Sequence, residues 1–249
     1  MMYIIIGIYG LLLGSFFNVV GFRIPKGKSI VSPRSACSKC SQKLSWIELI
    51  PFFSYMMQKG TCRKCGQPIS PLYPTIELLT AVLFVFAYFV FGFSMGLVVA
   101  LTLISLLVII TITDLTYTMI PDKLLFFFFL LFFAERLVYP LDPWWNSLMG
   151  GVVAFLVLYV IAFVSQGGMG GGDIKLFTLI GFAVGLKVFL LSFFLATLFA
   201  AIYGSFGILF GKMKKKSVVP FGPFIAVGTL LSFFFYESIM DVYLSLFLI

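Results

Sequence analysis

Histidine is absent from this chain of 249 residues, and charged residues make up only 10% of it. Without an imidazole, the chain cannot build a serine–histidine–aspartate triad or a histidine-ligated metal site. General acid–base chemistry therefore falls to its nine aspartate and glutamate residues.

The low charge content also excludes an ordinary water-soluble domain, since such domains carry roughly 25% charged residues. The chain is 61% hydrophobic, and its mean hydropathy is +1.14. Its net charge of +8 is a weak indication of nucleic-acid binding, because the basic residues lie mainly in loops between apolar runs. We therefore expect the chain to partner a lipid bilayer and not nucleic acid.

Long apolar runs dominate the sequence, and a membrane span needs about 20 such residues to cross roughly 30 Å of hydrocarbon. The first run has no charged leader and no small-residue cleavage site, so it is interpreted as a retained span rather than a signal peptide. The pattern predicts an all-α polytopic membrane protein with about eight transmembrane helices, although seven or nine would also fit. The eight runs cover residues 3–22, 75–92, 94–113, 121–139, 144–165, 174–186, 188–210 and 218–239.

Basic residues predict the orientation, because cytoplasmic loops of membrane proteins are enriched in Lys and Arg. With the N-terminus outside, all but Arg136 and Lys187 of the 17 basic residues lie in or beside cytoplasmic segments. The expected location is the bacterial inner or plasma membrane. The predicted cytoplasmic segments are 23–74, 114–120, 166–173 and 211–217.

The segment 23–74 is the one sizeable polar stretch, and it divides the chain into three predicted parts. These are a first transmembrane helix over 1–22, a cytoplasmic insert over 23–74 and a transmembrane core over 75–249.

All four cysteines lie in this insert, as the pairs Cys37/Cys40 and Cys62/Cys65, each with two intervening residues. Two such pairs can bring four thiolates to one tetrahedral Zn²⁺, with Gly66 allowing the tight turn after the second pair. Two disulfides or four free thiols are the alternatives, and a reducing cytoplasm disfavours the disulfides. Four cysteine ligands leave no open position, so a zinc ion here would be structural.

Two aspartates lie at the predicted cytoplasmic ends of apolar runs. Asp114 ends the third run and Asp173 opens the sixth, after a segment with five glycines in 167–172. Taken singly, Asp173 could be an N-cap and Asp114 an ordinary span-end residue that reaches the interface. So many glycines are not needed merely to start a helix, however, and they would let a peptide backbone approach closely.

A pair of carboxylates at one site holds a single proton between them, because both cannot ionise cheaply. The ionised member can activate water, while the protonated member polarises the scissile carbonyl and then protonates the leaving amine. The pair titrates as a unit, so neither Asp114 nor Asp173 is assigned a fixed role. Asp122 is the rival to Asp114, but Pro121 before it favours a helix start. Gly170, Gly172 and Lys175 are candidate substrate contacts, and Lys175 could also simply snorkel.

Several motifs in order give the chain a resemblance that runs nearly end to end. The chain resembles the type IV prepilin peptidases, which are bifunctional membrane enzymes. The motifs are Gly14-Ser15-Phe16-Phe17-Asn18, Arg34-Ser35 before the cysteine pairs, Tyr73-Pro74 with Glu77, the two aspartate segments, and Pro220-Phe221-Gly222-Pro223-Phe224.

The resemblance implies that Asp114 and Asp173 are the catalytic pair of an aspartyl endopeptidase. The implied substrates are prepilins or pseudopilins, cut after a glycine at the cytoplasmic face. The resemblance also implies N-methylation of the new terminal residue with S-adenosylmethionine, an activity associated with the cysteine-bearing insert. Glu48 in the insert is a candidate for that second activity, or a solvated surface charge. The chain has no strand–Gly-x-Gly–helix unit, so methylation rests on the resemblance alone. The length is similar to that of competence-type members.

Two other functions compete with this reading. A preflagellin-type peptidase without methylation would use the same aspartates, but the intact cysteine pairs argue against it. A transporter or scaffold could use the aspartates to bind an ion or a proton, and it would predict an inverted repeat that the sequence does not display.

Overall fold

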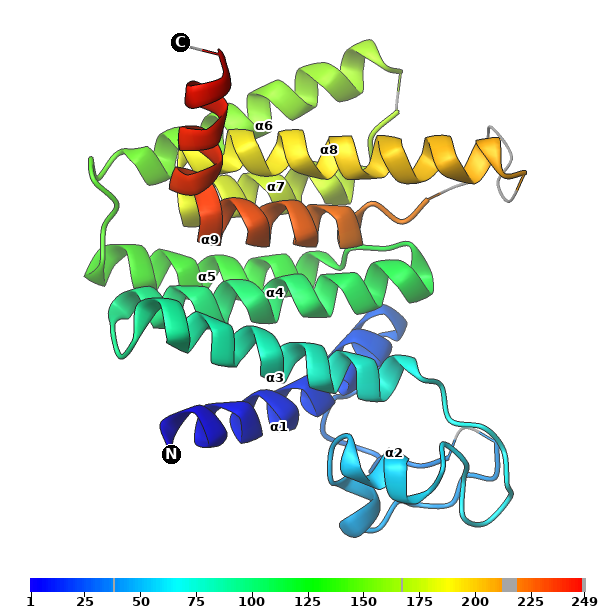
Figure 1. The fold of residues 1–249 in the computed structure, drawn as a ribbon. Coiled ribbons are helices and arrows are strands. Elements are labelled where there is room, and N and C mark those ends of the chain that lie inside the picture. The colour runs from blue at the N-terminus through cyan, green and yellow to red at the C-terminus, as the bar shows by residue number, and fades with distance from the viewer. Residues whose placement is uncertain (38, 167, 212–218, 248–249) are drawn as a thin grey trace. The chain divides into compact units, whose positions relative to one another are not determined.

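The computed structural model describes residues 1–37, 39–166, 168–211 and 219–247, and these form an all-α fold (Figure 1). Eight long helices coincide with the eight predicted apolar runs, so the predicted fold class is confirmed. Within the described residues, β structure is limited to two isolated bridges in the insert. The elements are α1 (Met2–Arg23), η1 (Ile24–Lys26), η2 (Ile47–Leu49), α2 (Phe53–Met57), α3 (Leu72–Phe91), α4 (Met95–Tyr117), α5 (Asp122–Val138), α6 (Asn146–Val164), α7 (Gly171–Val184), α8 (Leu186–Leu209) and α9 (Gly222–Phe247).

Six of these helices are long and apolar enough to cross a membrane, namely α1, α3, α4, α6, α8 and α9. The other two are shorter, with 17 residues in α5 and 14 in α7. Both are shorter than the roughly 20 residues that a full span requires. The predicted count of eight therefore matches the helices, but only six of them meet the length criterion.

The chain folds as two compact units, Met1–Ile112 and Thr113–Ile249, whose boundary falls inside α4. The division of the chain at residues 22 and 74 stays a prediction. The predicted cytoplasmic segment 211–217 lies, apart from Gly211, outside the described residues.

The first unit is organised by the close packing of α1 against α3 (Figure 1). A Cβ on Gly14 would lie 2.8 Å from the Cα of Glu77, and one on Gly10 would lie 2.5 Å from the Cα of Ala81. Glycines four residues apart let two membrane helices approach with their backbones almost in contact. This contact brings the polar C-terminal part of α1 next to the first turns of α3.

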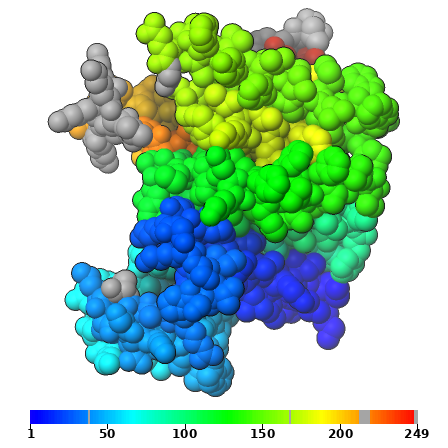
Figure 2. Space-filling view, turned by 180° about the vertical axis from the view of Figure 1, so that it is seen from behind, coloured from blue at the N-terminus to red at the C-terminus, as the bar shows by residue number. Residues whose placement is uncertain are grey.

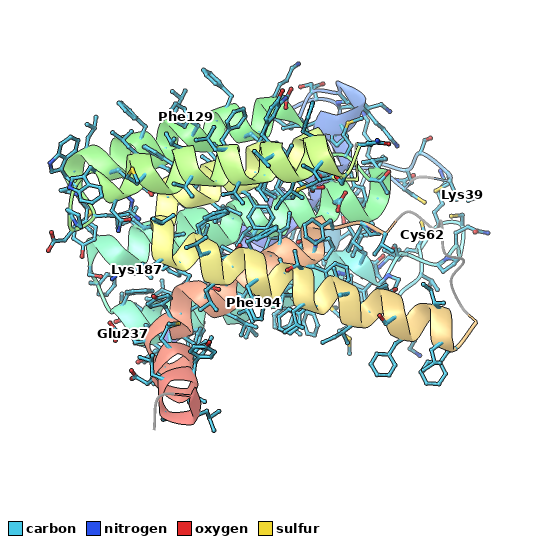
Figure 3. All side chains as sticks on the ribbon, turned by 90° about the horizontal axis from the view of Figure 1, so that it is seen from above. Lys39, Cys62, Phe129, Lys187, Phe194 and Glu237 are labelled. Atoms are coloured by element: carbon cyan, nitrogen blue, oxygen red, sulfur yellow. The ribbon has the colours of Figure 1, made fainter. Side chains whose placement is uncertain are left out.

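The second unit pairs α6 with α7 and α8 with α9. Gly150 and Gly181 face each other so closely that a Cβ on either would collide with the backbone of the other. Gly228 likewise allows α9 to pack closely against α8, because a Cβ on it would lie 2.7 Å from the Ala196 nitrogen. Helix α9 bends at Phe235, whose backbone is not helical, and its two arms run in different directions (Figure 1). Figure 3 shows Glu237 on the second arm.

Two helix ends differ from prediction. Helix α4 continues past Asp114 to Tyr117, because the Thr118 amide still bonds to the Asp114 carbonyl at 2.8 Å. Helix α7 begins at Gly171, before Asp173 instead of after it. Both aspartates therefore lie inside helices.

Candidate active site and metal centre

Asp114 is buried near the C-terminal end of α4, with only 6% of its surface exposed. Its Oδ2 accepts a hydrogen bond of 2.6 Å from the backbone N–H of Gly222, the first residue of α9. The first amides of a helix have no intrahelical partner and carry the positive end of the helix dipole. The start of α9 therefore holds this carboxylate in the interior, which does not fit a span-end residue that simply reaches the interface.

The close approach of Gly222 leaves no room for a side chain. A Cβ on Gly222 would lie 2.9 Å from both the Cβ and the Oδ2 of Asp114. Sequence reasoning did not identify Gly222 as a site residue, although its Pro-Phe-Gly-Pro-Phe segment was the signal that could have done so.

Asp173 is the third residue of α7 and is half-buried. The N-cap of this helix is Gly170, not Asp173, so the N-cap interpretation is wrong in detail. The carboxyl of Asp173 is instead hydrogen-bonded to the backbone of Gly170. A side chain at the third helical position that reaches back to the N-cap amide is half of a capping box. The glycine therefore fixes the direction of the aspartate side chain.

Asp114 and Asp173 both belong to the second unit, and the negative charge of Asp114 acts on Asp173. Two carboxylates at one site would hold a single proton between them, because both cannot ionise cheaply. Such an arrangement can donate a proton at one oxygen while it accepts one at another, which is the requirement for acid–base catalysis.

The surroundings of Asp173 account for the remaining residues predicted for this site. A Cβ on Gly172 would lie 3.0 Å from the Cβ of Ile120, so the backbone is closely packed there. Lys175 bonds to both carboxylate oxygens of Asp122, at 2.8 and 2.9 Å. Asp122 is the first residue of α5, as expected for a helix start. Its partner is an exposed lysine, and the lysine is directed to this carboxylate instead of snorkelling. Substrate contact by Gly170, Gly172 and Lys175 stays a prediction.

The four cysteines of the insert form one cluster, with all four sulfurs within 4.8 Å of one another. The Sγ atoms of Cys37 and Cys65 are 3.8 Å apart, and those of Cys40 and Cys62 are 3.9 Å apart. A tetrahedral zinc with Zn–S bonds of about 2.3 Å places its sulfurs about 3.8 Å apart, whereas a disulfide requires about 2.05 Å. The residues fit a zinc ion and do not fit a pair of disulfides.

Two equivalent backbone turns build this cluster. In the first, the Cys37 amide bonds to Gln42 and the Ser41 amide bonds back to Cys37; in the second, the pairs are Cys62 with Gln67 and Gly66 with Cys62. Gly66 has a φ of 67° and Ser41, at the matching place, a φ of 55°. The predicted tight turn at Gly66 is therefore present, and its counterpart is made without glycine.

The same turns influence the acidity of the thiols. Hydrogen bonds from the Cys40 and Lys39 backbone lower the pKa of Cys37 to about 6. The backbone amides of Cys65 and Lys64 lower the pKa of Cys62. At Cys65 the Gln67 amide acts in the same direction, but desolvation and the neighbouring sulfurs outweigh it and raise the pKa to about 11. The first two shifts favour thiolates, which are the form that binds zinc.

A cavity of about 510 Å³ lies between the insert and the ends of α1 and α3. Figure 2 shows the insert as a lobe beside α1. Lys39 and Cys62, two of the cavity-lining residues, belong to this insert and are labelled in Figure 3. Buried Glu77, 7% exposed, accepts a hydrogen bond of 2.7 Å from the Phe52 amide and is also bonded to the Ser15 side chain. Glu48 also lines the cavity, and its Oε2 accepts hydrogen bonds from the amide and the hydroxyl of Ser45.

Asn18 is the most buried polar residue lining this cavity, with 2% of its surface exposed. Its Nδ2 donates to the Tyr73 carbonyl at 3.2 Å, and its Oδ1 has no partner. Asn18 and Glu77 were not predicted as site residues. The signal was a polar side chain within an otherwise apolar run, which is costly unless it has a role.

Two family profiles match the chain, one over the part that contains the cysteine cluster and one over the part that contains both aspartates. The profile of the Bacterial Peptidase A24 N-terminal domain matches residues 8–91, and that of the Type IV leader peptidase family matches residues 101–205. The chain is 45% identical to a protein of Bacillus subtilis (strain 168) named prepilin leader peptidase/N-methyltransferase, over 97% of this chain and 98% of that one.

More distant relatives carry the same name. One from Xanthomonas campestris is 32% identical, over 94% of this chain and 92% of the relative. One from Vibrio cholerae is also 32% identical, over 93% of this chain and 96% of the relative. No solved structure matches the chain.

Proposed function

This chain belongs to the type IV leader peptidase family, and from that premise we propose that it cleaves prepilin leaders with Asp114 and Asp173 as an aspartyl endopeptidase. The family identifies the chain as a prepilin peptidase with N-methyltransferase activity. The observation that carries the aspartyl mechanism is the charge interaction of these two carboxylates within the second unit. The relatives reported above are named neither as transporters nor as preflagellin peptidases.

The two carboxylates have different surroundings, and this suggests how the pair works. Asp114 is fixed by a helix-terminal amide, which stabilises its charged form, while Asp173 lies at the glycine-rich start of α7 and is half-buried. The ionised carboxylate takes a proton from water, whose oxygen attacks the scissile carbonyl. The protonated carboxyl hydrogen-bonds the carbonyl oxygen and afterwards gives its proton to the leaving amine. The pair ends with one proton, as it began.

Several finer features belong to the same proposal. The substrates are prepilins or pseudopilins, the cut follows a glycine, and the active site faces the cytoplasm of a chain whose N-terminus is outside. The distribution of basic residues supports this orientation. Gly170 carries no Cβ beside the Asp173 carboxyl, where one would lie 2.9 Å from its Oδ2, so an extended leader could approach Asp173 on that side. Gly172 is packed against Ile120 and would contact the leader through its backbone only.

The insert has a structural part in this proposal. We assign one zinc ion to Cys37, Cys40, Cys62 and Cys65, whose sulfur separations match a tetrahedral site. The ion would supply rigidity, not chemistry, because four thiolates fill its coordination sphere. S-adenosylmethionine is the methyl donor for the second activity.

The test is to co-express the chain with a prepilin that has a Gly–Phe junction and to weigh the products by mass spectrometry. Removing one acid–base group costs about 10²-fold or more in rate, so Asp114→Asn and Asp173→Asn should leave the leader attached. Asp122→Asn is the matched control, since that exposed carboxylate is engaged by Lys175 and should still permit processing.

Two results would bear against the proposal in different ways. Full processing by both active-site variants would remove the aspartyl mechanism. A correct cut without an additional mass of about 14 Da, the increment of one methyl group, would remove methylation while leaving the peptidase intact.

A further inference from the structure

We propose that Arg136 is a positioning residue for leader cleavage, because it holds the C-terminal end of α7 and thereby sets where Asp173 lies near the other end of that helix. This inference deepens the proposed aspartyl mechanism and rests on the catalytic role of Asp173. Helices α5, α6, α7 and α8, which carry every contact used below, all belong to the second unit.

The burial of Arg136 needs a specific reason. Arg136 lies in the last turn of α5, and only 9% of its surface is exposed. It is one of the two basic residues outside the predicted cytoplasmic segments, so the positive-inside pattern does not account for it. The negative charge of Glu135 acts on it, but Glu135 is the preceding residue of the same helix. A buried cation in a membrane protein is costly and by default indicates a function.

The guanidinium of Arg136 is directed at backbone carbonyls. Its Nε donates to the Ala183 carbonyl at 2.8 Å, and its Nη2 donates to the same oxygen. Its Nη1 donates to the Tyr139 carbonyl at 3.2 Å, directly after α5. Ala183 lies in the last turn of α7, and the last carbonyls of a helix have no intrahelical partner and carry the negative end of its dipole. Arg136 therefore caps the C-terminus of α7 from a neighbouring helix.

Two further contacts fix the same end of α7. Gly185, directly after the helix, has a φ of 83° and a ψ of 172°, a backbone conformation that favours glycine. The amide of Leu186 beyond it donates to the Oδ1 of Asn146, the first residue of α6, at 3.0 Å. One turn earlier, Gly181 packs directly against Gly150. The last turn of α7 is therefore held by α6 as well as by α5.

The polar contact that α5 makes with the start of α7 is exposed. It is the ion pair of Asp122 with Lys175, and exposed pairs of this kind contribute little. A Cβ on Gly171 would meet nothing within 4 Å, so this end of the helix has open space beside it. Asp173 precedes Ala183 by ten residues, which is about 15 Å along the helix axis. A rotation or shift at Ala183 is carried through the helix and displaces the carboxyl of Asp173.

The experiment measures the kcat of leader cleavage by the full chain in lipid nanodiscs. Arg136→Met has a side chain of similar length but no donor for the Ala183 carbonyl, so the end of α7 is released. A misplacement of about 1 Å in a catalytic group can cost about 10²-fold, and we expect kcat to fall about tenfold or more.

Lys187→Met is the matched control, since this exposed lysine at the start of α8 is the other basic residue outside the predicted cytoplasmic segments (Figure 3). It should cleave within about twofold of the wild type, as expected for a surface substitution.

The shape of the pH–rate profile separates positioning from stability. This profile reports the titrations of the carboxylate pair. A displaced Asp173 interacts differently with Asp114, so the profile of Arg136→Met should change shape over the pH range in which thermal unfolding shows the variant to be folded. A loss of folded protein lowers the rate by the same factor throughout that range. An unchanged shape, or a wild-type kcat, would overturn the inference.

Coupling between the two ends of α7 provides a second measurement. Distant sites without shared partners act independently to within about twofold in rate. In Arg136→Met, the pair of Asp122 with Lys175 is the remaining polar link from α5 to α7 among those that the structure describes. Asp122→Asn should therefore lower kcat in that background by clearly more than twofold beyond its effect in the wild type. Independent effects of the two substitutions would contradict the transmission through α7.

Arg136→Lys keeps the inference testable if Arg136→Met does not fold. Lysine restores the cation and one donor but not the two N–H groups that meet at the Ala183 oxygen, so its kcat should lie between those of Arg136→Met and the wild type. If Arg136→Lys and Arg136→Met both cleave as the wild type does while Asp173→Asn is inactive, this inference alone fails. Full processing by Asp173→Asn would remove the proposed mechanism and this inference together.

Discussion

The aspartate site and the cysteine site are built in opposite ways. The cysteine cluster is assembled from two short turns, each closed by hydrogen bonds between residues at most five apart in the chain. The aspartate site is assembled from helix ends, and the amide that holds Asp114 lies 108 residues further along. One site can form while the rest of the chain is still unpacked, and the other exists only once α4, α7 and α9 have met.

This difference teaches where each site is vulnerable. A locally built site depends on its own ligands and on the metal that joins them, because a small insert buries too little apolar surface to be stable alone. A site built from distant helix ends depends on packing, where an added methyl group cannot be accommodated. Gly222→Ala and Cys40→Ser each remove one of these supports, and a third set of variants tests an exposed ion pair that belongs to neither.

The largest effect is expected for Gly222→Ala. The new Cβ would lie 2.9 Å from the Oδ2 of Asp114, so the carboxylate or the start of α9 must move. A misplacement of about 1 Å in a catalytic group can cost about 10²-fold, and we expect a loss of that order in leader cleavage. Gly204→Ala is the control, since nothing lies within 4 Å of the Cβ it would add on α8. Cleavage at the wild-type rate by Gly222→Ala would show that the contact does not position Asp114.

An intermediate effect is expected for Cys40→Ser, which removes one of the four proposed zinc ligands. Zinc content, measured by atomic emission, should fall from about one ion per chain, which is the stoichiometry of a four-cysteine site. Methylation of a leaderless prepilin should fall with it, while cleavage should fall less than in Gly222→Ala. Lys64→Gln, an exposed change on the second turn of the cluster, should keep the zinc. A Cys40→Ser protein that retains both zinc and methylation would refute the structural role of the metal.

The smallest effect is expected at the ion pair of Asp122 and Lys175. The two side chains are 69% and 57% exposed, and exposed ion pairs contribute about 1 kcal/mol or less. A double-mutant cycle with Asp122→Asn and Lys175→Gln, followed by thermal unfolding, should give a coupling of that size. If Lys175→Gln slows cleavage far more than Asp122→Asn does, the lysine contacts substrate, as its place two residues beyond Asp173 predicts.

The cysteine site was predictable from sequence because its geometry is local. The two pairs have fixed spacing, and Gly66 marks the turn that follows the second one. The matching turn at Ser41 adopts the same left-handed backbone without the glycine that would have indicated it in the sequence. Spacing therefore predicted the cluster better than the turn residues did.

The aspartates were predictable as candidates but not in their surroundings. An ionisable residue beside a long apolar run can be recognised from the sequence alone. Which helix start would supply the amide to Asp114, and which carboxylate would pair with Lys175, depends on how α4, α5, α7 and α9 pack. The ends of α4 and α7 were misplaced because hydropathy stops at a charged residue, whereas a helix continues as long as its backbone bonds do.

The cavity beside the insert could not be predicted, because it arises where two distant segments meet. Asn18 belongs to the apolar run 3–22, and Glu77 belongs to the apolar run 75–92. The two residues line one cavity because glycines of α1 pack closely against α3.

The shortness of α7 has a consequence for the lipid around it. At 1.5 Å per residue its 14 residues extend about 21 Å, which is about 9 Å less than the hydrocarbon thickness. Both of its ends cannot reach the headgroups of an undistorted bilayer, so either the membrane is indented beside this helix or water fills the difference. If the shortfall lies at the Gly171 end, the proposed catalytic Asp173 is below the level of the surrounding lipid surface, and bilayer thickness should then affect the rate of leader cleavage.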